Sequence, residues 1–126
     1  MPWKTPPPEV RDAVNRALGG DIYAQAARAW QRAQAADPQV VLESWFRTPE
    51  EHFRLPGAAR YSQHLIGTAI DLVERDRARR NALIQALRAE RFHVIPRGRR
   101  VHVQAMNPQE FQSVLPALRA AGLFGR

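Results

Sequence analysis

Two histidines and one aspartate have the residue types and spacing to hold a metal ion together. His64 and Asp71 lie seven positions apart with a glycine between them, and His102 lies between two valines. If the chain bends at the glycine, the first two side chains turn toward one point, and a neighbouring strand would bring the third. Zn²⁺ takes such nitrogen and oxygen ligands at about 2.0–2.2 Å and keeps a fourth position for water in catalytic sites. Spacing alone leaves an alternative open, in which His64 is an ordinary buried histidine.

The composition limits what kind of site this can be. The 126 residues include no cysteine, which excludes disulfides, thiolate metal ligands and cysteine nucleophiles. Hydrophobic residues make up 44% and charged residues 25%, the balance of a globular domain rather than of a disordered, collagen-like or coiled-coil chain. No apolar run approaches the roughly 18 residues of a membrane span, so we expect no membrane partner. The first residues lack the apolar stretch of a secretory signal peptide.

The charge balance is strongly basic. Nineteen Lys and Arg residues against twelve Asp and Glu give a formal net charge of +7, which favours polyanions such as nucleic acid or bacterial cell-wall polymers. An arginine-rich composition inherited from a GC-rich or thermophilic source is the alternative explanation. A nucleic-acid-binding module is therefore a rival interpretation. We expect no specific nucleic-acid partner, because the chain has no groove-reading motif and no aromatic stacking platform.

Hydrophobic spacing predicts helices around a group of short strands. The helical pattern covers residues 8–18, 22–36, 74–91 and 107–121. The strand-like runs cover residues 40–46, 64–73, 92–95 and 101–105. The last two runs are joined by an arginine-rich turn, and a polar loop follows the first. The fold class predicted is α+β, a small antiparallel sheet flanked by helices.

One domain is expected over residues 1–126, because domains of roughly 100–150 residues are the commonest size. We divide it into a helical lead-in over 1–37, a core over 38–106 and a C-terminal helix over 107–126. Thr5 is a candidate cap for the first helix, and Pro116 is expected to kink or interrupt the last one.

The remaining aromatic and imidazole side chains have ordinary interpretations. We expect Trp45 and Phe46 to pack in the core of the first strand, His52 to be solvated in the polar loop, and His93 to be half-exposed on a strand. A place for His93 at the site, orienting a ligand or binding substrate, is the alternative.

A longer pattern surrounds the three candidate ligands. Residues 44–47 read S-W-F-R, residues 62–71 read S-Q-H-L-I-G-T-A-I-D, and residues 101–103 read V-H-V. This order resembles the zinc D-alanyl-D-alanine carboxypeptidase and phage peptidoglycan endopeptidase superfamily. Its signature is S-x-x-R, then S-x-H-x-x-G-x-A-x-D, and later a histidine on a strand. The likeness runs over about residues 40–104 and implies the hedgehog-type fold of that superfamily.

The resemblance implies a role for each matching residue. His64, Asp71 and His102 would be the zinc ligands, Arg47 would anchor a substrate carboxylate or carbonyl, and Ser62 would lie near the substrate-binding edge. The implied reaction is hydrolysis of a peptide bond in peptidoglycan stem peptides, usually one involving a D-amino acid. Zinc would polarise the scissile carbonyl and lower the pKa of its water toward about 7.

The sequence departs from the superfamily at the position of the usual catalytic acid. Many members have Glu or Asp three residues before the last histidine, where this chain has Arg99, and another branch has Asp where this chain has Gln104. Neither side chain takes up a proton at neutral pH. Glu43, Glu51 and Glu90 are the candidates for a displaced base. The alternative function is therefore a catalytically degenerate member that serves as a virion structural or cell-wall-binding protein.

The resemblance also implies partners and a place of action. A peptidoglycan peptide is the expected partner of a monomeric, phage-encoded lysin. Without a signal peptide, such a protein would stay in the host cytoplasm until its release to the cell wall, or be carried in a virion, where it would be assembled with other proteins. Three arginines of the turn, Arg97, Arg99 and Arg100, are expected on solvated surface, where they would help to retain the protein on anionic polymer.

Overall fold

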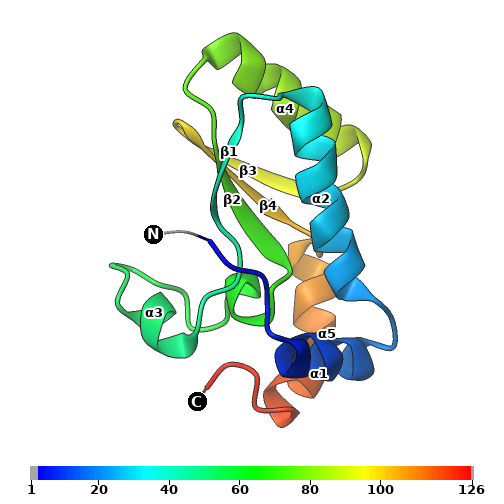
Figure 1. Ribbon diagram of the computed structural model, residues 1–126. Coiled ribbons are helices and arrows are strands. Elements are labelled where there is room, and N and C mark those ends of the chain that lie inside the picture. Colours follow the sequence, from blue (N-terminus) through cyan, green and yellow to red (C-terminus); the bar gives the residue numbers. More distant parts are fainter. Residues whose placement is uncertain (1–2, 126) are drawn as a thin grey trace.

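The computed structural model describes residues 3–125 as five α-helices, a short 3₁₀-helix and one sheet (Figure 1). The helices are α1 Pro8–Leu18, α2 Ile22–Ala36, α3 Pro49–Phe53, α4 Arg77–Ala89 and α5 Pro108–Ala120, with the 3₁₀-helix η1 at Gln63–Ile66. The strands are β1 Val41–Ser44, β2 Ala69–Val73, β3 His93–Arg97 and β4 Arg100–Gln104. The predicted α+β class is confirmed. No helix within residues 3–125 is long and apolar enough to cross a membrane.

The four strands are antiparallel and lie in the order β1-β2-β4-β3. In the central pair, Asp71 of β2 lies opposite His102 of β4. The hairpin between β3 and β4 turns through two residues, so that Arg97 and Arg100 face each other where we expected a five-residue turn. Gly98 takes a φ of +63° there, a left-handed conformation that glycine adopts without steric cost.

One face of the sheet is buried under α2 and α4, which lie side by side in Figure 1. Alternate residues of the central strands point into this core, because successive side chains of a strand project to opposite faces. The helices contribute small and aliphatic side chains, which let them approach the sheet closely. The core residues of β2, β4 and the two helices are Ile70, Leu72, Val101, Val103, Ala26, Ala29, Ala33, Leu83, Ile84 and Leu87.

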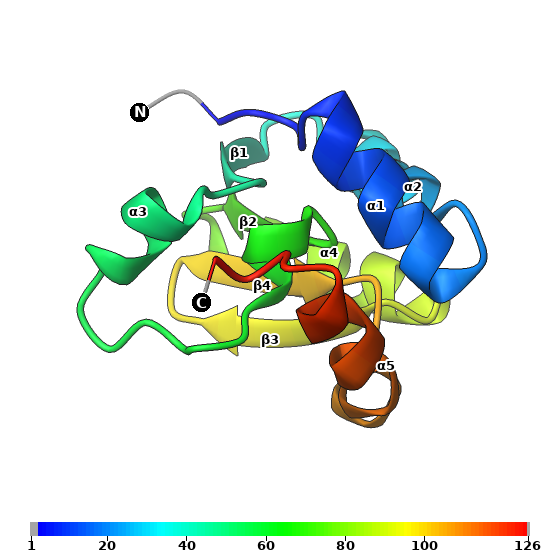
Figure 2. The ribbon, with the colours of Figure 1, turned by 90° about the horizontal axis from the view of Figure 1, so that it is seen from below.

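A second, smaller core holds η1 between α1 and α5. Leu65 and Ile66 of η1 are buried together with Val14 of α1 and with Phe111 and Leu118 of α5. Figure 2, which views the molecule from below, shows η1 beneath the end of β2, with α1 and α5 to one side. Because two helices pack on this short turn, the segment that precedes β2 is fixed in place.

The segment before α1 is an extended arm that contacts the residues after β1 and the helix α3. The backbone N–H of Phe46 donates to the carbonyl of Lys4 at 3.0 Å, and the Lys4 ammonium lies 2.7 Å from the Glu51 carboxylate. The residue preceding α1 is Pro7, which makes no side-chain cap, so the prediction that Thr5 caps the helix is wrong. A proline in the first turn has the φ that a helix requires and lacks only an N–H that would stay unbonded there.

Several predicted boundaries are corrected by the structure. The expected loop after β1 contains α3, which Thr48 and Glu51 start with reciprocal side-chain to backbone hydrogen bonds. The strand expected over 64–73 begins only at Ala69, and the fourth helix begins at Arg77 because Asp76 caps it. α5 runs without interruption through Pro116.

Candidate metal centre

η1 positions His64. The backbone N–H of His64 donates to the Ser62 hydroxyl at 3.2 Å, which starts the turn. Gly67 ends it with a φ of +75°, and a Cβ on that residue would lie 2.5 Å from the ring of Pro6 in the arm. The indole N–H of Trp45 also donates to the Gly67 carbonyl at 2.8 Å. Glycine is therefore required there both by conformation and by the close approach of the arm.

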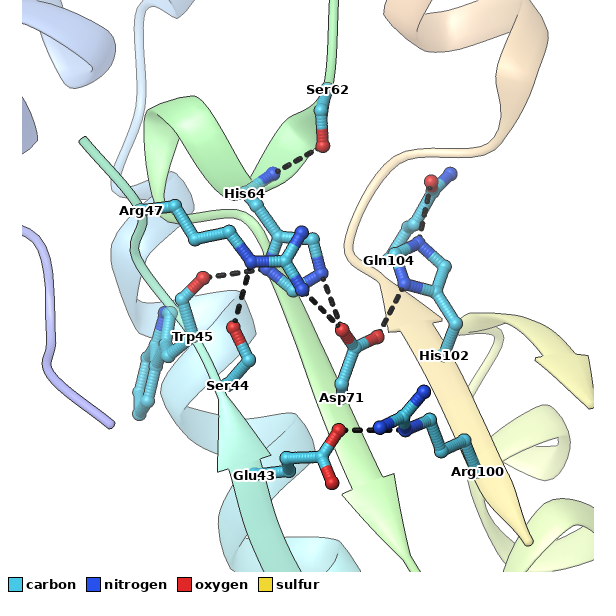
Figure 3. A network of polar contacts seen from close by, with 10 residues as sticks. All are labelled: Glu43, Ser44, Trp45, Arg47, Ser62, His64, Asp71, Arg100, His102 and Gln104. Carbon is cyan, nitrogen blue, oxygen red and sulfur yellow. Dashed lines mark hydrogen bonds and ion pairs between the residues drawn. The ribbon is translucent and has the colours of Figure 1, made fainter. Parts of the chain in front are cut away.

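The three candidate ligands meet on the open face of the sheet (Figure 3). The Nδ1 atom of His102 lies 2.7 Å from one Asp71 carboxylate oxygen, and the Nε2 atom of His64 lies 3.1 Å from the other. One ligand atom from each residue lies within 4.8 Å of the other two. Ligands of a tetrahedral zinc ion are about 3.4 Å apart when each bond is about 2.1 Å long, so the spacing suits that ion.

The protonation of His64 leaves its second ring nitrogen with a free lone pair. Its Nδ1 atom lies 2.6 Å from the carbonyl oxygen of Trp45, which can only accept, so Nδ1 carries the proton. Burial lowers the pKa of His64 and outweighs the opposing effect of Asp71, so the ring is neutral. The buried Nε2 atom has no hydrogen-bond partner among the described residues. A lone pair facing a carboxylate at 3.1 Å calls for a cation between them.

Gln104 fixes the orientation of the His102 ring, as the Trp45 carbonyl does for His64. The Gln104 amide nitrogen donates to the Met106 carbonyl at 3.2 Å, which directs the amide oxygen toward Nε2 of His102 at 2.9 Å. Nε2 therefore donates to the Gln104 amide oxygen, and Nδ1 is the ring nitrogen that faces Asp71. Acceptors behind metal-binding imidazoles commonly fix the ring in this way.

The Asp71 carboxylate is ionised and paired. Its two oxygens face the imidazoles of His102 and His64, and the charged guanidinium of Arg47 favours the ionised form of the carboxyl. Arg47 adds a third contact, from Nη2 to Asp71 at 2.7 Å, and its Nε donates to the Ser44 hydroxyl at 3.0 Å. As metal ligands, two imidazoles in the neutral form and one carboxylate make a donor set with a net charge of −1, which fits Zn²⁺.

An irregularity in β1 brings two further side chains to the same region. Leu42 pairs with Leu72 and Ser44 pairs with Asp71, so Glu43 is an extra residue in the strand. Such a bulge changes the direction of the side chains after it and is frequent beside active sites. Here it allows Glu43 and Ser44, although adjacent, to lie toward the cleft side, where Glu43 pairs with Arg100 at 2.7 Å.

A cleft of about 680 Å³ opens over the three candidate ligands. Its walls come from β1, from the segment that follows α3, from the β3–β4 hairpin and from the start of α5. The polar and charged side chains that line it, apart from the three ligands, include Glu43, Arg47, Ser62, His93, Arg97 and Arg100. Both residues expected to bind substrate therefore border the cleft, although two of the five N–H donors of Arg47 are already engaged.

The three acidic residues considered as a displaced base lie in different places. Glu51 is bound to Lys4 and to the backbone N–H of Thr48. Glu90 follows the end of α4 and pairs with Arg32 at 3.6 Å. Of the three, only Glu43 lines the cleft.

Arg99, which occupies the usual acidic position, lies in the exposed turn between β3 and β4. It is absent from the lining of the cleft, whereas Arg97 and Arg100 on either side of it belong to that lining. The usual acidic position therefore contributes nothing to the site in this chain.

The two other histidines and two aromatic residues differ in how far their positions match the prediction. The prediction that His52 is solvated is wrong: the residue is buried, and its Nε2 atom lies 2.7 Å from the Ala59 carbonyl. His93 is half-buried and lines the cleft. Trp45 and Phe46 are buried as expected, although both follow the last residue of β1.

Two groups that position the histidines were missed by the sequence analysis. The Trp45 carbonyl belongs to the backbone, so no residue type signals it. Gln104 had a signal, because it lies two residues after His102 and therefore on the same face of β4.

A family model described as Peptidase M15 matches residues 11–106 of the chain. The match spans the whole core between the sheet, α2 and α4, spans part of the second core, and includes all three candidate ligands. No curated protein and no solved structure matches the chain.

Proposed function

The chain belongs to the peptidase M15 family, and we propose that it hydrolyses peptide bonds of peptidoglycan stem peptides with a zinc ion held by His64, Asp71 and His102. One observation carries this proposal: two imidazoles and an ionised carboxylate converge at the floor of a cleft, and the buried Nε2 atom of His64 faces that carboxylate at 3.1 Å with no hydrogen-bond partner among the described residues. Without a cation, a lone pair of the neutral His64 ring that faces a carboxylate is electrostatically unfavourable. A peptidase family and a built cation site together support a metallopeptidase.

The zinc ion would supply a Lewis acid that polarises the scissile carbonyl. The chain's own groups hold the site rigid: the Trp45 carbonyl and the Gln104 amide fix the imidazoles, and Arg47 orients the carboxylate. We assign the role of proton acceptor to Glu43, because it is the acidic candidate in the cleft. Its 2.7 Å contact with Arg100 holds the carboxylate on the cleft side of β1.

The substrate is assigned from the charge of the cleft. Peptidoglycan stem peptides carry free carboxylates, and the cleft contains three arginines. The N–H donors of Arg47 that are not engaged by Ser44 and Asp71 are available to a substrate carboxylate or carbonyl. The resemblance to D-alanyl-D-alanine carboxypeptidases and phage lysins extends the proposal to a terminal or cross-linking D-alanine bond and to a phage-encoded, monomeric enzyme.

The proposal is tested by measuring zinc content and hydrolysis on the same samples. Protein purified without chelator is assayed for zinc by mass spectrometry and incubated with soluble peptidoglycan fragments, whose products are separated by liquid chromatography. We expect one zinc per chain and a new product, both lost in His64→Ala. His93→Ala is the matched control for zinc content, because within residues 3–125 this histidine lines the same cleft without a hydrogen bond or ion pair to any of the three ligands.

The products also separate the finer alternatives. Release of free D-alanine indicates a carboxypeptidase, and opening of cross-linked fragments indicates an endopeptidase. Zinc without any cleavage, together with co-sedimentation of protein and peptidoglycan, would favour the degenerate wall-binding alternative, which Arg99 at the usual acidic position motivates. Absence of zinc would contradict the proposal.

A further inference from the structure

Two arginines face each other at the end of the hairpin that forms one wall of the cleft. Arg97 of β3 is paired directly with Arg100 of β4, and like charges opposite each other destabilise an antiparallel pair. Glu43 compensates only one of them, through its 2.7 Å contact with Arg100. Among residues 3–125, no carboxylate lies within ion-pair distance of Arg97. The cleft therefore keeps one positive charge that the described chain does not neutralise.

The arginine pair lies at a defined position relative to the candidate metal ligands. Ile95 is opposite His102, and Arg97 follows Ile95 by two residues on the same face of β3. Two residues along a strand correspond to about 6.6 Å. A bound peptide in extended conformation covers that distance in about two residues.

We propose that Arg97 and Arg100 form a subsite for a second carboxylate of the peptide substrate, carried by the second residue before the bond that is cut. This inference rests on the proposed peptidase function and specifies its substrate. A planar guanidinium binds a carboxylate through two parallel hydrogen bonds, and within residues 3–125 no side-chain partner engages the donors of Arg97. Glu43 pairs with the Arg100 guanidinium, so the subsite carries a net charge of +1, which matches one carboxylate rather than a polyanion.

Arg99 provides a control for the general positive charge of the hairpin. It lies between the two subsite arginines in sequence, yet it is exposed in the turn and does not line the cleft. Arg97→Gln and Arg99→Gln therefore remove the same charge from neighbouring exposed positions. Only the first removes a donor from the cleft.

The test uses two synthetic N-acetylated peptides that end in D-Ala-D-Ala. They differ only in the second residue before the D-Ala-D-Ala bond, which is glutamate in one and glutamine in the other. Binding to the zinc-free protein is followed by NMR titration, so that the peptides are not consumed. We expect the wild type to bind the glutamate peptide about tenfold more tightly, as one charge-assisted hydrogen bond provides. Arg97→Gln should bind both peptides equally, and Arg99→Gln should keep the preference.

The outcomes that overturn the subsite are distinct from those that overturn the function. Equal or undetectable binding of the two peptides by the wild type overturns the subsite, as does a preference that survives Arg97→Gln or disappears equally in Arg99→Gln. Circular dichroism of each variant checks that the fold is intact. With zinc restored, cleavage of both peptides at equal kcat/KM leaves the peptidase and removes the subsite. Cleavage of neither peptide, at full zinc content, contradicts the carboxypeptidase form of the proposed function.

Discussion

The two faces of the sheet are held in place by different kinds of interaction. Asp71 and Leu72 are neighbours in β2, yet Leu72 is fully buried against α2 and α4 while Asp71 lies at the floor of a cleft. Apolar packing is undirected and tolerates exchange of one aliphatic side chain for another of similar volume. The cleft face instead depends on directed hydrogen bonds and ion pairs between particular groups. One strand thus supplies stability with one set of residues and chemistry with the next.

The largest effect is expected on the cleft face, from Asp71→Asn. The amide keeps the size of the side chain but removes the charge that both imidazoles and Arg47 contact. Because even partners behind the ligands are worth 10–100-fold in metal affinity, we expect zinc to bind more than about a hundredfold more weakly. Hydrolysis should fall with it. Competition with a zinc-binding dye measures the affinity, and an unchanged affinity would remove Asp71 from the ligand set.

Leu72→Ala tests the opposite face at the adjacent position. Removing a fully buried leucine leaves a cavity and costs about 3 kcal/mol of unfolding free energy, or roughly 150-fold in the folding equilibrium. Urea unfolding followed by circular dichroism measures the loss. We expect the folded fraction to retain its zinc stoichiometry. Loss of zinc from a folded Leu72→Ala protein would show that the two faces are coupled more closely than their separate contacts indicate.

Glu43→Gln separates chemistry from binding within the cleft. A general base contributes about 10²–10⁴-fold, so we expect kcat to fall at least about a hundredfold while zinc content and KM change little. If KM rises while kcat holds, Glu43 acts only by holding Arg100.

Gln104→Leu tests whether an amide behind a histidine supports the metal. Leucine cannot accept the proton of His102 Nε2, so the ring loses its fixed orientation. We expect about tenfold weaker zinc binding with little change in unfolding free energy. Gln104→Glu, which still accepts, is the control, and equal losses in both variants would contradict the orienting role.

The smallest effect is expected beside the cleft, where the arm contacts α3. The Lys4 ammonium, followed by the Thr48 backbone N–H, lowers the pKa of Glu51 from 4.5 to about 2. A lowered pKa stabilises the fold at pH values above 4.5, and this contribution is lost as the pH falls toward 2. Lys4→Gln should therefore cost less than about 1 kcal/mol at pH 7, because the pair is partly exposed. Urea unfolding at pH 7 and pH 2.5 should show the difference shrinking in acid.

The sequence predicts more of the fold than of the contacts within the site. The family inferred from the S-x-H-x-x-G-x-A-x-D pattern is confirmed by the Peptidase M15 match, and the α+β class is confirmed as well. His64 was placed on a strand because Leu65 and Ile66 form an apolar run. The structure instead forms a turn there, started by Ser62, whose apolar side chains pack between α1 and α5. The local periodicity of the sequence carries no information about that tertiary packing.

His52 shows the same limit on a smaller scale. Its neighbours in sequence are polar, which favours a solvated loop, but α3 is too short to have a periodic pattern and is held by its own capping hydrogen bonds. The partner of the buried imidazole is a carbonyl seven residues later, at Ala59. The assignment of His64, Asp71 and His102 as zinc ligands stays a prediction, which the measured zinc content will decide.

The pairing of Asp71 with His102 joins segments 31 residues apart in the chain, and this has a consequence for folding. The site is completed only when the β3–β4 hairpin has docked on β2 in the correct register. A slip of one residue would turn His102 into the core and expose Val101 and Val103. An ion that binds only the correctly paired strands shifts the equilibrium away from the misaligned pairing by mass action. Metal binding would thus also favour the correct register of the strands that form the site.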